Sequence, residues 1–167
     1  MKAISNNYFI AGLATVTIAA MAVAGPAFAQ HAGFSLISPD EAAASDGALA
    51  AHGGKAPFEA KAFDPMAPQI IVITPKIDHP THPPLDVRVE AHTQASLGVN
   101  RSSLKVRYGF FKVDVTERLL KYGQWQGNAF VVSGADVPPG NHVFFVSIAD
   151  TAGHEGVAAM KVIVLPH

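Results

Sequence analysis

The chain has 167 residues, with 12 basic and 13 acidic side chains, no cysteine and 49 % hydrophobic residues. The lack of cysteine excludes disulfides, thiolate metal sites and a lipid on an N-terminal cysteine, and the balanced charge does not match a nucleic-acid binder. We therefore expect no nucleic-acid partner and a fold that is held together by its core alone.

The first 29 residues have the pattern of an export signal. Lys2 precedes an apolar run over residues 10–24, and the small residues Ala27 and Ala29 match the requirement of the signal peptidase. This pattern predicts cleavage after Ala29, export by the general secretory route, and a periplasmic or extracellular location. The alternative is a retained membrane anchor, which the glycines within and after the run disfavour. After signal removal we expect no membrane span.

Residues 30–67 are rich in Ala, Gly, Ser, Asp and Pro, and their apolar side chains follow neither a helical nor a strand period. This composition predicts a mostly disordered leader. Within it, the run S-P-D-E at residues 38–41 is typical of a helix start, so we expect a short helix over residues 40–51. Three aromatic residues of the leader are available to cover an apolar surface: Phe34, Phe58 and Phe63.

From residue 68 onward, short β-branched and aromatic runs alternate with Pro, Gly, Asn and Asp. Apolar and polar residues alternate within several of these runs, which predicts strands with one buried face. The expected strands are residues 70–74, 85–91, 104–108, 110–115, 130–133, 142–149 and 157–165. About seven strands in about 100 residues indicate an all-β, antiparallel sandwich over residues 68–167.

One segment of this domain has two interpretations. Thr116 is a candidate cap for a brief helix that ends at Gly123, and a twisted strand is the alternative. The helix is favoured because Glu117, Leu119 and Lys121 are better helix formers than strand formers.

Four runs carry a resemblance to a known family: VNRSSLKVRYG at residues 99–109, DVT at 114–116, PPGNH at 138–142 and IADTAGH at 148–154. They resemble bacterial secreted immunoglobulin-like (Big-type) domains, in which a P-x-G-x-H turn leads into a strand that ends in D-x-x-G-N. The resemblance covers residues 69–166 and departs from the family at His154, where asparagine is usual. It implies an immunoglobulin-like β-sandwich with binding or spacer duties and no catalytic residues.

The recurrent residues of these runs have structural explanations. We expect Asp150 to accept backbone N–H groups across the turn that follows it, and Gly153 to supply the positive φ that closes this turn. We expect the ring of His142 to donate to the carbonyl of a neighbouring loop. Calcium binding by Asp150 and Glu155 is the alternative, but no alternating run of oxygen ligands accompanies them.

Histidines provide the candidate metal site. His79 and His82 lie in one proline-rich loop beside Asp78, and imidazole with carboxylate suits zinc or divalent copper. Two imidazoles do not complete a tetrahedral site, and a solvated loop is the alternative. A third ligand would have to come by folding from one of three histidines: His92, His142 or His154.

The chain offers no serine in a glycine-flanked elbow, so we expect neither catalysis nor a cofactor. In the last hairpin, the alternation predicts that Phe144, Val146 and Ile148 fill the core and that Val143, Phe145 and Ile163 face away from it. These outward residues form either a partner-binding surface or an apolar patch that a helix or the leader covers. The resulting hypothesis is a non-catalytic, exported binding or structural module that contacts a protein or a cell-envelope component. The alternative is periplasmic copper or zinc binding through His79 and His82.

Overall fold

The computed structural model describes residues 33–55, 64–77, 79–94 and 96–166. By its contacts the part of the chain over residues 31–167 forms one compact unit, and the fold below is that of this unit. The predicted export signal at residues 1–29 lies outside the described residues, as do Phe58, Phe63 and Asp78. Among the described residues, no helix is long and apolar enough to cross a membrane.

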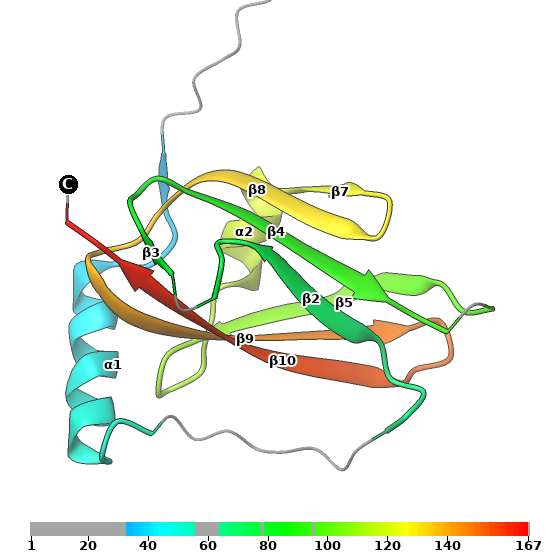
Figure 1. Cartoon of the computed structure of the whole chain (residues 1–167), viewed down its shortest axis with the longest axis horizontal. Helices are drawn as coiled ribbons and strands as arrows, with labels where there is room; N and C mark the ends of the chain where they lie inside the picture. The colour runs from blue at the N-terminus through cyan, green and yellow to red at the C-terminus, as the bar shows by residue number, and fades with distance from the viewer. Residues whose placement is uncertain (1–32, 56–63, 78, 95, 167) are drawn as a thin grey trace, which may run out of the picture. The chain divides into compact units, whose positions relative to one another are not determined.

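Two five-stranded sheets pack face to face (Figure 1). Sheet A contains β1 (Phe34–Ser35), β8 (Ala129–Asp136), β4 (Leu85–His92) and β2 (Gln69–Thr74) in that order, and β7 (Gln124–Gln126) also pairs with β8. Sheet B contains β3 (Pro80–Thr81), β10 (Glu155–Val164), β9 (Gly140–Asp150), β5 (Val99–Tyr108) and β6 (Val113–Asp114).

The strand order confirms the fold class that the sequence predicted. The sequence of neighbours β2-β4-β8-β7 opposite β10-β9-β5-β6 is the arrangement of immunoglobulin-like sandwiches. Two short parallel pairings, β1 with β8 and β3 with β10, extend the otherwise antiparallel sheets. The sequence pattern did not predict β1, β3 or β7, because each has only two or three residues and therefore shows no period.

The core lies between the sheets and is built by alternating residues. In β9, the predicted core residues Phe144, Val146 and Ile148 are each 2 % exposed. Met160 and Val162 of β10 pack beside them, and Leu104 and Val106 of β5 lie on the same inner face. The period of two therefore identified the buried face of sheet B correctly.

The helix predicted near residues 40–51 is present as α1 (Pro39–Ala51). Ser38 Oγ accepts from the backbone N–H of Glu41, and a Glu41 carboxylate oxygen accepts from the N–H of Ser38, which is a complete capping box. The residues before this helix also belong to the domain, since Leu36 and Ile37 are 3 % and 1 % exposed. The ordered domain thus begins earlier than the boundary at residue 68 that the composition suggested.

The helix expected after Thr116 is confirmed as α2 (Thr116–Tyr122), and Gly123 is its C-cap. Its capping differs from the prediction: Val115 is the N-cap, and Thr116 Oγ1 instead accepts from the backbone N–H of Val106 at 2.8 Å. The predicted strand over residues 110–115 is wrong for its first half, because a turn with positive φ at Gly109 and Lys112 precedes the short β6.

Candidate functional site

The turn between β9 and β10 has the structure that the sequence predicted for Asp150. This carboxylate is 1 % exposed and accepts from the backbone N–H of Ala152 at 2.8 Å and of His154 at 3.0 Å. Its second oxygen lies 2.8 Å from His154 Nδ1, and Gly153 has φ +93°. Burial alone would raise the pKa of Asp150, but these hydrogen bonds hold it below its usual range. Asp150 therefore organises the turn.

The ring of His142 also makes the predicted bond. His142 Nε2 lies 2.7 Å from the carbonyl oxygen of Pro138, which can only accept, so this nitrogen carries the proton. Nδ1 then accepts from the Tyr108 hydroxyl at 2.8 Å. Burial lowers the pKa of His142 and raises that of Tyr108 to about 12. Both ring nitrogens are occupied, so His142 offers no free base.

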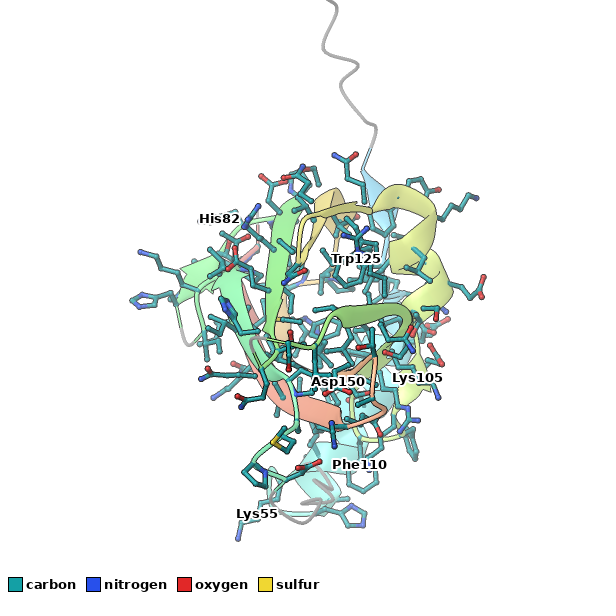
Figure 2. All side chains as sticks on the ribbon, turned by 90° about the vertical axis from the view of Figure 1, so that its right-hand side faces the viewer. Lys55, His82, Lys105, Phe110, Trp125 and Asp150 are labelled. Carbon is teal, nitrogen blue, oxygen red and sulfur yellow. The ribbon has the colours of Figure 1, made fainter. Side chains whose placement is uncertain are left out.

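The candidate metal loop lies beside an open hollow of about 350 Å³. His79 and Asp86 line this hollow together with Lys76. The positive charge of Lys76 disfavours a metal cation there. His82 is exposed and does not line the hollow (Figure 2). Among the described residues, no group of three or more His, Cys, Asp or Glu side chains is arranged to hold a metal ion.

None of the three possible third ligands completes a site with His79 and His82. His92 ends β4, about 23 Å along the strand from Leu85 at a rise of about 3.3 Å per residue, and its Nε2 lies 3.4 Å from a Glu90 oxygen. His154 is bonded to Asp150 in the distant β9–β10 turn. His142 is close in register to the loop, but its nitrogens are occupied.

The predicted partner surface is on the outer side of sheet B, but it is less apolar than expected. Val143 and Ile163 are half-buried, and Phe145 is only 8 % exposed. Arg107 is paired with Phe145 across the strands, and Lys112 Nζ lies 5.9 Å from the centre of the Phe145 ring. Long basic side chains lie along apolar surface in this way and keep their charged ends in water.

We call this surface the sheet-B face and define it by its exposed residues: Lys105, Arg107, Val157, Ala159 and Lys161. The strand register brings them together, since Lys105 and Val157 both pair with Ser147, and Arg107 and Ala159 both pair with Phe145. The face therefore presents cations around small apolar side chains. Alternation alone could have identified these positions as outward-facing, but the sequence interpretation named only Val143, Phe145 and Ile163.

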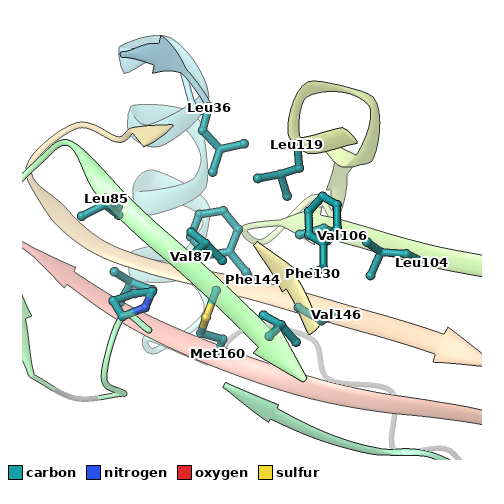
Figure 3. Close-up of a pocket in the computed structure, with 13 residues that line it drawn as sticks. Leu36, Leu85, Val87, Leu104, Val106, Leu119, Phe130, Phe144, Val146 and Met160 are labelled. Atoms are coloured by element: carbon teal, nitrogen blue, oxygen red, sulfur yellow. The ribbon is translucent and has the colours of Figure 1, made fainter. Parts of the chain in front are cut away.

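The space between the sheets contains one further feature of interest, an apolar cavity of about 30 Å³ (Figure 3). Its lining residues are all apolar and include Leu85, Val87, Phe144 and Met160. This volume corresponds to about one water molecule, and an apolar cavity of that size stays dry. It is a packing defect of the core and too small for a ligand.

No family model matches the chain, and no curated protein matches it. Among solved structures, an endo-β-1,4-mannanase from Thermotoga petrophila aligns with 62 % of this chain and 21 % of its own, at 15 % identity and a TM-score of 0.46. CopC from Methylosinus trichosporium OB3b aligns over 59 % of this chain and 96 % of its own length, at 13 % identity and a TM-score of 0.43. The chain spans about a fifth of the mannanase. Similarity at this level assigns neither family nor function.

Proposed function

We propose that the protein is a non-catalytic binding module that works outside the cytoplasm and contacts a protein or cell-envelope component through the sheet-B face. The observation that carries the proposal is the combination of exposed cations and small apolar side chains on this face. Its long central strands, β9 and β10, provide a rigid platform. Rigid strands hold a binding surface more exactly than loops do.

The experiment is site-specific photo-cross-linking in cells that export the protein. A photoreactive phenylalanine replaces Ala159 on the sheet-B face, and a matched control replaces Gln126, which is exposed on β7 of the other sheet. We expect a discrete adduct from position 159 alone, and its loss when Lys105→Glu and Lys161→Glu are added. Equal adducts from both positions, or an adduct that survives the charge reversal, would contradict the proposal.

Copper or zinc binding through His79 and His82 is the second candidate. It is favoured by one observation, the position of His79 and Asp86 on the same hollow. If it is correct, zinc or copper raises the unfolding temperature and the double substitution of His79 and His82 by alanine removes the rise, whereas His92→Ala keeps it. A melting curve that neither metal changes would eliminate this function.

A further inference from the structure

The turn between β5 and β6 exposes an aromatic side chain that the fold does not use. Gly109 and Lys112 have φ +68° and +52°, and the Lys112 N–H donates to the Gly109 carbonyl at 3.3 Å. The chain reverses here, so Phe110 and Phe111 lie at the corner. Among the described residues, Phe111 has the largest exposed fraction of any large hydrophobic side chain, 64 %.

The turn is held in place from one side by α1, through Ser45 in the middle of the helix and His52 at its C-cap. Ser45 Oγ accepts from the backbone N–H of Phe110 at 3.1 Å, and the ring of Phe110 lies 4.5 Å from that of His52, centre to centre. The rings of Phe110 and Phe111 meet edge to face at 5.3 Å. Phe110 thus anchors the turn, and Phe111 projects into water from a fixed support.

The segments that meet at this aromatic corner carry exposed cations. Lys55 follows α1, and Figure 2 shows it at the same end of the molecule as Phe110. Lys105 and Arg107 are exposed on the strand that leads into the turn, and Lys112 closes it. Two acidic side chains lie on the same segments, counting α1 from Ser45 onward: Asp114, which pairs with Arg107 in register, and Asp46. The four cations outnumber these two carboxylates, so the segments at this corner carry a net positive charge.

We propose that the β5–β6 turn binds an anionic lipid bilayer, with Phe111 in the interfacial region and Lys55, Lys105 and Arg107 among the headgroups. Aromatic side chains favour the membrane interface, and each nearby cation adds attraction to anionic lipid. A bilayer accepts a projecting side chain without a matching pocket, whereas a protein partner must supply one. The proposal shares Lys105 and Arg107 with the sheet-B face, but its test changes Phe111, which lies outside that face.

The test uses the protein recovered after export and measures its co-sedimentation with lipid vesicles. We expect binding to vesicles that contain phosphatidylglycerol, weaker binding to pure phosphatidylcholine, and a decrease at high ionic strength. Phe111→Ser should weaken binding about tenfold, since it removes a large apolar side chain from the interface. Leu120→Ser, at a position that is 43 % exposed on α2, is the matched control and should bind as the unchanged protein does.

Thermal unfolding of both variants shows whether either change disturbs the fold, and none is expected at these exposed positions. Vesicles that fail to bind the unchanged protein at low ionic strength would overturn the proposal and favour a protein pocket for Phe111. Equal losses in Phe111→Ser and Leu120→Ser, or full binding by Phe111→Ser, would also overturn it. The Ala159 adduct is measured separately, so either proposal can fail alone.

Discussion

His142 and His154 are close to opposite ends of the same hairpin, and their surroundings move their pKa values in opposite directions. Burial lowers the pKa of His142, because the charged ring would lose its water and face the Tyr108 hydroxyl proton. The hydrogen bond to Asp150 raises the pKa of His154. The two rings therefore make opposite contributions to the dependence of stability on pH.

We expect acidification to destabilise the protein through His142 and to stabilise it through His154. Unfolded His142 gains a proton near pH 6.5 while the folded form resists it, so its stabilising effect is present above about pH 6.5 and is lost below. For His154 the effect is present below about pH 6.5 and is lost as the pH rises through its higher folded pKa. The measurement is the urea midpoint between about pH 8 and about pH 5.5.

Compared with the unchanged protein, His142→Gln should lose less stability over this range, and His154→Gln should lose more. Identical slopes for the unchanged protein and His142→Gln would show that the buried ring does not titrate during unfolding.

Two glycines give a matched pair of substitutions with opposite expected signs. A Cβ at Gly123 would overlap the ring of Phe130 and lie 2.6 Å from Val132 Cγ2, so Gly123→Ala should cost about 1–3 kcal/mol. Gly47 is inside α1, and a Cβ added there would meet no neighbouring atom within 4 Å. Gly47→Ala should therefore stabilise the protein by about 0.5–1 kcal/mol. Chemical denaturation measures the free energy of unfolding of both variants. Similar changes in the two would contradict the prediction.

Among the secondary-structure elements, α1 depends most on one contact. Glu41 caps its own helix and also forms a two-pronged ion pair with Arg118 of α2, at 2.7 and 2.8 Å. The same guanidinium donates to the carbonyl of Leu36 at 2.9 Å. The Arg118 hydrogen bonds lower the pKa of Glu41 to about 2, despite partial burial. This contact fastens the N-terminal segment to the sandwich.

We expect Glu41→Gln to cost about 1–2 kcal/mol, because it removes the charged pair with Arg118, whereas the glutamine amide oxygen can still accept from the Ser38 N–H and complete the capping box. Loss of the ion pair between Glu41 and Arg118 should appear first as faster amide hydrogen exchange in residues 34–51. Glu117→Gln, on the exposed first turn of α2, is the control and should leave both quantities unchanged. The stabilising effect of Glu41 is present above about pH 4.5 and is lost as the pH falls toward about 2.

These elements also show what the sequence could predict. The start of α1 was predictable, since a capping box uses residues three apart. Its attachment was not, because Arg118 and the buried Leu36 and Ile37 carry no local period that links them to the sandwich. The strand expected over residues 110–115 failed because a positive φ at Lys112, unusual for lysine, has no reliable signal in the sequence.

The candidate sites divide in the same way. The roles of Asp150, Gly153 and His142 were predicted because each depends on a turn or loop within a few residues. The outward orientation of Val143, Phe145 and Ile163 was predicted, since alternation gives orientation. The cover over Phe145 was not, because it comes from Arg107 on β5 and Lys112 in the β5–β6 turn and depends on the strand register.

For the molecule as a whole, the position of the N-terminal boundary decides whether the domain folds. Phe34, Leu36 and Ile37 are buried, and their removal would expose apolar surface worth about 5–8 kcal/mol, a typical total stability for a domain. A chain that begins at residue 31 should therefore unfold cooperatively. One that begins at residue 68 should show no sharp thermal transition, and a normal transition there would refute this account.

The pairing of β1 with β8 also has a consequence for the order of events during folding. Phe34 is one of the first residues of the domain in the chain, and its strand partner, Ala135, follows about 100 residues later. Contacts of such high sequence separation form slowly, and an apolar segment that waits for its partner is open to aggregation. The unfolded chain should therefore depend on a chaperone for these residues until β8 is free to pair with β1.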